Sequence, residues 1–175
     1  LEERELHLWR FLRLGYDRGP WVVRDLTDDR VAVLTRAVGH LTGEAHLLKG
    51  FTRFSEQEGV LVGEIAPKNR VLPLLRPHFC ARYPEESFVL YDRTHREALF
   101  YRPRRWAIVP LEAFRAAAPG REERDFRRLW RRFYDTIAIE GRENPRCRMT
   151  QMPKRFWGTM TEFQNETEER KELAP

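Results

Sequence analysis

The spacing of hydrophobic side chains changes near Phe51, and this change constrains the fold more than any other feature of the sequence. Before Phe51, apolar residues recur every three or four positions, as on one face of a helix; after it they alternate, as in a strand. We therefore expect two helices followed by a β-hairpin with its turn at 56–59. The expected helices span 1–14 and 25–50, and the expected strands span 51–54 and 60–65.

The same two spacings alternate through the rest of the chain. An apolar stretch at 71–83 favours a helix despite its prolines, and a second hairpin follows, with a further strand after it. Strands expected at 88–91, 98–101 and 106–109 bring the total to about four or five. This order of elements predicts an α+β fold, with an antiparallel sheet and helices packed mainly on one of its faces.

Length and composition favour one domain. With 175 residues, 41% of them hydrophobic, the chain can bury one sizeable core, which we expect over 1–163. Residues 164–175 are polar, without an apolar stripe, and are expected to form a tail or linker. No apolar run is long enough to span a membrane. Cys80 and Cys147 are too far apart for a disulfide framework, which favours a reducing, cytoplasmic location.

The excess positive charge lies near the C-terminus. Residues 121–157 hold 11 Lys or Arg and 6 Asp or Glu, a surplus equal to the net charge of +5 of the whole chain. Aromatic and aliphatic residues from Phe126 to Ile137 follow helical spacing and leave arginines on the opposite face. Such a surface suits an anionic partner, although a solvated helix face explains the arginines of this helix equally well. The candidate contacts are Arg127, Arg128, Arg131, Arg132, Arg146, Arg148, Lys154 and Arg155, with Phe156 or Trp157 stacking on a base.

A second line of basic residues runs through the middle of the chain. Three of them, Lys49, Arg53 and Arg76, are added to the candidate nucleic-acid contacts, and Lys68 and Arg70 lie in a turn that leads into a helix. Glutamates are close to these residues in sequence, so ordinary surface charge is the competing interpretation.

Catalytic and metal-binding patterns are scarce. No pair of histidines stands four residues apart on a helix, and no Cys-Xaa-Xaa-Cys occurs, so we predict neither a metal site nor a cofactor. His46 and His78 are the candidates for an acid or base, because both lie where regular structure is interrupted. The sequence favours a chain without catalytic activity of its own.

Four phrases resemble the bacterial DUF4130 family of DNA metabolism proteins. They are FLRLGYDRG at 11–19, GEAHLLKGFTRF at 43–54, NRVLPLLRPHFCARYP at 69–84 and LWRRFYDTIAIEGRENPRCRMTQMPKRFWGTMTEF at 129–163. They span nearly the whole chain in the order of that family. Members of the family usually carry an additional N-terminal region, which we expect to be absent from this chain.

The resemblance implies a role in DNA repair. Relatives are encoded beside a radical S-adenosylmethionine (SAM) protein, and some are fused to a uracil-DNA-glycosylase-like domain. The motifs of those enzymes do not occur in this sequence, so catalysis is expected to reside in a partner. The leading hypothesis is a DNA-binding accessory module. The alternatives are an adaptor that docks one of these partner proteins through Met-Pro-Lys-Arg-Phe-Trp, and an enzyme that acts on a damaged base or nucleotide.

Overall fold

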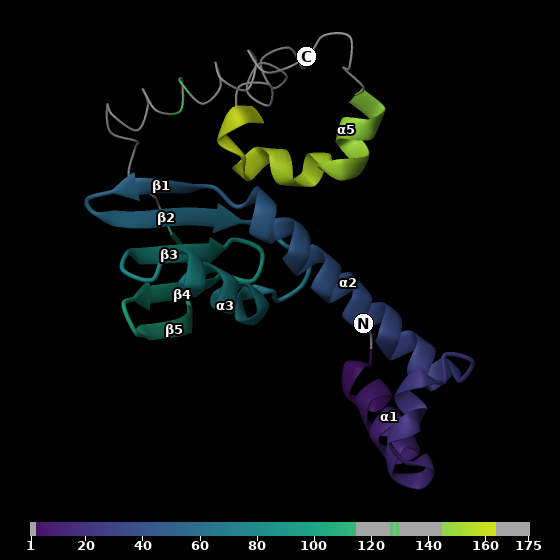
Figure 1. Cartoon of the computed structure of the whole chain (residues 1–175). Coiled ribbons are helices and arrows are strands. Elements are labelled where there is room, and N and C mark those ends of the chain that lie inside the picture. The colour runs from purple at the N-terminus through teal and green to yellow at the C-terminus, as the bar shows by residue number, and fades with distance from the viewer. Residues whose placement is uncertain (1–2, 115–126, 128, 130–144, 164–175) are drawn as a thin grey trace.

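The computed structural model describes residues 3–114, 127, 129 and 145–163, and it has the expected α+β architecture (Figure 1). The helices of the described part are α1 (Arg4–Arg18), η1 (Pro20–Arg24), α2 (Asp29–Phe51), α3 (Leu72–Arg82), α5 (Pro145–Gln151), η3 (Lys154–Thr159) and η4 (Thr161–Phe163). The strands are β1 (Phe54–Gln57), β2 (Val60–Ile65), β3 (Ser87–Asp92), β4 (Glu97–Arg102) and β5 (Arg105–Pro110).

The five strands form one sheet in the order of the chain, β1-β2-β3-β4-β5. Three neighbouring pairs are antiparallel, as expected, but β2 and β3 are parallel, with Gly63 opposite Leu90. A parallel pair needs a crossover connection, and α3 provides it between β2 and β3. The expectation of a wholly antiparallel sheet is therefore corrected at this one pair.

The boundary between α2 and β1 lies later than the sequence predicts. Phe51 is the last residue of the helix, and the strand begins only at Phe54. The ring of Phe51 packs against that of Phe156, with 5.4 Å between centroids, and Thr52 ends the helix with its backbone N–H bonded to the Leu48 carbonyl. A contact with a segment about a hundred residues away thus sets the end of the helix.

Helix α2 begins where its capping residue predicts. Asp28 has an extended backbone, and its carboxylate accepts a hydrogen bond from the backbone N–H of Arg30 at 3.0 Å. The Arg30 guanidinium also bonds this carboxylate at 2.7 Å. The side-chain bond from Arg30 is the main reason that the pKa of Asp28 falls to about 2.

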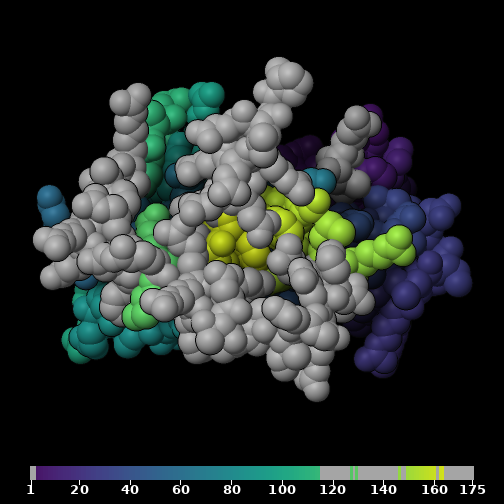
Figure 2. All heavy atoms as spheres, turned by 90° about the horizontal axis from the view of Figure 1, so that it is seen from above, coloured from purple at the N-terminus to yellow at the C-terminus, as the bar shows by residue number. Residues whose placement is uncertain are grey.

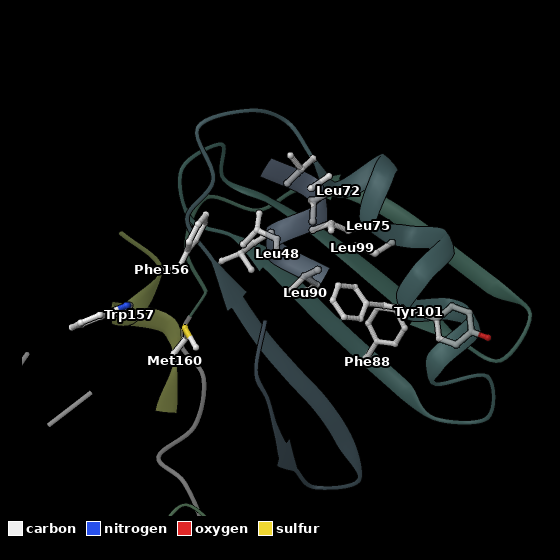
Figure 3. Close-up of a cluster of buried hydrophobic side chains, with 14 of the residues drawn as sticks. Leu48, Leu72, Leu75, Phe88, Leu90, Leu99, Tyr101, Phe156, Trp157 and Met160 are labelled. Atoms are coloured by element: carbon white, nitrogen blue, oxygen red, sulfur yellow. The ribbon is translucent and has the colours of Figure 1, made fainter. Parts of the chain in front are cut away.

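The main core lies between the sheet and the two helices α2 and α3. Leu48 of α2 and Leu75 of α3 pack with Leu90 of β3 and Leu99 of β4, which lie opposite each other in the sheet (Figure 3). Phe54 of β1 lies edge-on to Phe79 and Phe88, with centroids 5.2 and 5.7 Å away. Helices α2 and α3 thus cover the same face of the sheet, as expected.

The other face of the sheet is contacted by residues that follow β5. The Phe114 ring packs on Tyr91, with centroids 5.3 Å apart, and the Arg127 guanidinium bonds the Ser55 hydroxyl. Tyr91 is buried as a result. Two described positions after β5 thus contact this face, Phe114 at β3 and Arg127 at β1.

Helix α1, η1 and the first half of α2 form an arm that projects away from the sheet (Figure 1). The arm has a small core of its own, in which Leu14, Val22 and Val31 are buried and Phe11 packs against them. Asp28 at the start of α2 and Arg18 at the end of α1 are joined at 3.4 Å. We call these elements, residues 4–38, the helical arm.

Several expectations concern the chain after β5. Residues 111–114 are not helical, and of the expected basic helix only positions 127 and 129 are described, both of them helical. The expected tail, 164–175, lies outside the described residues. Among the helices that are described, none combines the length and the apolar character needed to cross a membrane.

Candidate nucleic-acid interface

The segment 145–163 packs against α2 through aromatic and sulfur-containing side chains. Phe156, Met160 and Phe163 are buried in the main core, and the Trp157 ring stacks on Phe163 with 4.7 Å between centroids (Figure 3). The Trp157 Nε1–H donates to the Met152 carbonyl at 3.0 Å. Neither Phe156 nor Trp157 presents a face on which a base can stack, so this part of the expected interface is corrected.

Glu44 of α2 holds three chain segments together. Its carboxylate accepts backbone N–H bonds from Lys68 and Asn69 at 3.0 and 2.9 Å, and the Arg155 guanidinium lies 3.5 Å away. Only 3% of the Glu44 side chain is exposed. Burial raises the pKa of this carboxyl group, but the donors of Lys68 and Asn69, with Arg155, outweigh burial and hold the pKa below its ordinary value.

A second buried carboxylate anchors Arg53. Glu162 of η4, whose side chain is 3% exposed, pairs with the Arg53 guanidinium at 2.6 Å. The same guanidinium donates to the Gly50 carbonyl at 2.8 Å, at the end of α2. Two ion pairs therefore join α2 to the segment 145–163. Glu44 of α2 pairs with Arg155 of the segment, and Glu162 of the segment pairs with Arg53, which follows α2.

The outer edges of these arginines remain at the surface. The Arg53 side chain is 28% exposed and that of Arg155 is 40% exposed, although the carboxylates beneath them are buried. Lys68, whose backbone N–H bonds Glu44, and Lys154, the neighbour of Arg155 in the sequence, are also exposed. Neither has a carboxylate partner within 4.0 Å among the described residues. Figure 2 shows part of the segment 145–163, in lime and yellow, at the surface. We name Arg53, Lys68, Lys154 and Arg155 the cationic cluster; it carries a surplus of positive charge over Glu44 and Glu162.

Other candidate contacts lie elsewhere. Lys49 is close enough to His78 of α3 to affect its pKa, and Arg76 lies over the Trp106 ring of β5 at 4.1 Å. Arg127 contacts Ser55 on the sheet face opposite α2 and α3. Within the described residues, the candidates thus form no single continuous track.

The remaining basic candidates can be placed only in part. Arg146 is exposed on α5, and this helix lies beside the helical turns that follow it in the segment 145–163 (Figure 1). The Arg148 side chain and the whole of Arg128, Arg131 and Arg132 lie outside the described residues.

The two candidate catalytic histidines are not brought together. His46 is exposed on α2 and His78 is half-buried on α3, and no hydrogen bond, ion pair or ring contact joins them in the described structure. Burial, with the positive charges of Lys49 and Arg82, lowers the pKa of His78 and favours the neutral form of its ring. Among the residues that the structure describes, no carboxylate bonds either ring and orients it.

His95, which the sequence does not single out, has such a carboxylate. Its Nδ1 lies 2.6 Å from the fully buried Asp92, which also accepts backbone N–H bonds from Thr94 and His95. This arrangement closes the turn between β3 and β4, as aspartates commonly do. The Asp-Xaa-Xaa-His spacing is its only signal in the sequence. Within the part of the chain that is described, no three His, Cys, Asp or Glu side chains gather closely enough to hold a metal ion.

The fold and this surface define a class: an α+β domain with a five-stranded mixed sheet, a helical arm and a cationic cluster above two buried carboxylates. The chain belongs to the DUF4130 family, a domain of unknown function, whose family model matches residues 2–162. This assignment confirms the resemblance seen in the sequence. No curated protein and no solved structure matches the chain.

Proposed function

We propose that this domain binds nucleic acid through the cationic cluster, as a cytoplasmic accessory module of DNA repair. The observation that carries the proposal is that both arginines of the cluster are paired with buried carboxylates. Buried Glu44 and Glu162 fix the directions of Arg155 and Arg53, while Lys68 and Lys154 add charge that no described carboxylate compensates. Oriented guanidinium groups lose less conformational entropy when they bind phosphate oxygens bidentately.

The expected partner of this surface is the sugar–phosphate backbone. Because the aromatic rings nearest the cluster are buried, base stacking makes no contribution here, and recognition rests on charge. Three or four phosphate contacts give a slope of about −3 to −4 in a plot of log affinity against log salt concentration on duplex DNA. Catalysis would then belong to the radical SAM protein or the uracil-DNA-glycosylase-like domain that the family resemblance implies.

The test is fluorescence anisotropy with labelled single- and double-stranded DNA over a salt series. The variant Lys68→Glu/Lys154→Glu changes two exposed lysines of the cluster without touching its buried carboxylates. We expect weaker binding and a salt slope smaller in magnitude by about 2. The matched control is Arg102→Glu/Arg105→Glu, which makes the same change in net charge at exposed positions of β4 and β5.

Two results would contradict the proposal. One is wild-type affinity that does not respond to salt, and the other is an equal loss of binding in the cluster variant and the control. Co-purification with the partner enzymes that survives nuclease treatment, in a protein that fails to bind DNA, would favour the adaptor hypothesis instead.

A further inference from the structure

The helical arm exposes a continuous apolar face that the arm itself does not use. On α1, Trp9, Leu12 and Tyr16 are 55%, 67% and 92% exposed, and the helical repeat places them on one side. Leu14, which is buried in the core of the arm, faces the opposite direction. Exposed tryptophan and tyrosine grouped in this way are typical of interfaces between proteins.

The apolar face is flanked by charges of opposite sign. Glu5 lies one turn before Trp9 and Arg13 one turn after it, on the same side of the helix. The Arg13 guanidinium lies over the Trp9 ring at 5.5 Å. Glu5 bonds only its neighbour Arg4 among the described residues, and both of these side chains are largely exposed, so the pair contributes little.

The apolar face of α1 and its two flanking charges are complementary to the same surface of a second copy. When two copies of α1 pack in antiparallel fashion about a two-fold axis at Trp9, position 5 of one helix faces position 13 of the other. Glu5 then meets Arg13 of the second copy on both sides of a central pair of Trp9 rings. A two-fold, isologous contact is also the commonest geometry among homo-oligomers.

We propose that the arm is a homodimerisation surface, in which α1 of one chain packs on α1 of a second copy. Burial of Trp9 and Leu12 in both copies stabilises the dimer, and the two Glu5–Arg13 pairs fix the antiparallel register. The inference is independent of nucleic-acid binding, because the arm lies apart from the cationic cluster (Figure 1).

Sedimentation velocity and light scattering on the full chain measure the outcome directly. We expect a dimer for the wild type and a monomer with an unchanged circular dichroism spectrum for Leu12→Glu. The control Val109→Glu places the same charge on an exposed apolar residue of β5 and is expected to remain dimeric.

A charge exchange then tests the register. Glu5→Arg alone and Arg13→Glu alone should each weaken dimerisation about tenfold, and the double variant should restore it, because opposite charges face each other again. A monomeric wild type overturns the proposal, as does a double variant no better than the single ones. A monomer whose Trp9→Ala and Tyr16→Ala variants lose affinity for single-stranded DNA would instead assign the arm to nucleic acid.

Discussion

Gly63 of β2 is the position at which a single added methyl group has the clearest expected effect. A Cβ atom there would lie 3.0 Å from Phe54 Cε1 and 3.2 Å from Leu90 Cδ1. The Phe54 ring is held by Phe79, Tyr83 and Phe88, so it cannot move aside freely.

We therefore expect Gly63→Ala to lower the free energy of unfolding by about 1–3 kcal/mol in urea titrations. Gly39→Ala is the matched control on the exposed surface of α2, where a Cβ meets nothing within 4 Å. Because alanine favours helices, it should stabilise the protein by about 0.5–1 kcal/mol. Equal changes in the free energy of unfolding for the two variants would show that the Phe54 ring moves to accommodate the added methyl group.

Asp28 is expected to confer stability that depends on pH. Its pKa is about 2 in the folded protein and 3.8 in the reference state, so the charged form is favoured by folding. The contribution is complete above about pH 4 and is lost as the pH falls toward 2. In Asp28→Asn the difference in Tm from the wild type should be constant near neutral pH and shrink through this window. A difference that persists at pH 2 would assign the effect to hydrogen bonding rather than charge.

At the scale of elements, the segment 145–163 depends on few anchors. Met160 is fully buried in the main core, and the buried carboxylate of Glu162 pairs with Arg53. We expect Met160→Ala to lower the free energy of unfolding by about 2–5 kcal/mol, and Glu162→Gln by about 1–3 kcal/mol through loss of a charged acceptor.

Limited proteolysis would show whether the loss is local. If the segment docks as one element, both variants should be cleaved first within 145–163 while the sheet remains protected. Simultaneous cleavage throughout the chain would mean that the segment is part of one cooperative core. The exposed variant Gln151→Ala serves as a control for the cleavage rate.

The elements themselves were largely predictable from local sequence, whereas their contacts were not. The strand β2 agrees with its expected bounds, and α2 starts at the aspartates that predicted its cap. The end of α2 was wrong, because Phe51 is held in the helix by Phe156. The parallel pairing of β2 and β3 was missed because strand spacing carries no information about direction.

In the candidate site, too, the residue types were predictable from the sequence and their contacts were not. The sequence identified Arg53 and Arg155 as basic, but it did not pair them with Glu162 and Glu44, which are far away along the chain. Trp157 was expected to stack on a base, yet its ring is buried and stacks on Phe163. Side chains of mixed character take their orientation from tertiary packing, which a local pattern does not encode.

At the scale of the whole molecule, the described part of the protein has two separate cores. Among the described residues, the core of the helical arm consists of Leu14, Val22 and Val31 with Phe11, whereas the main core joins the sheet, α2, α3 and the segment 145–163. A small core opens at lower free energy than a large one. Amide hydrogen exchange should therefore be faster in α1 than in β3 and β4.

The variant Leu14→Ala separates the two cores experimentally. It should accelerate exchange in α1 and η1 and leave the protection of β3 and β4 unchanged. Leu99→Ala, in the main core, is expected to accelerate exchange in both regions, because the arm is supported by α2. Equal acceleration everywhere by Leu14→Ala would indicate a single cooperative unit.

The outer edge of β5 has a consequence for behaviour at high concentration. This strand ends the sheet, and an open edge offers its backbone groups to strands of other molecules. Pro103 lies in the turn before it, Pro110 is its last residue and Arg105 its first. Proline cannot donate a backbone hydrogen bond and like charges repel, so these residues protect the protein from aggregation through added strands.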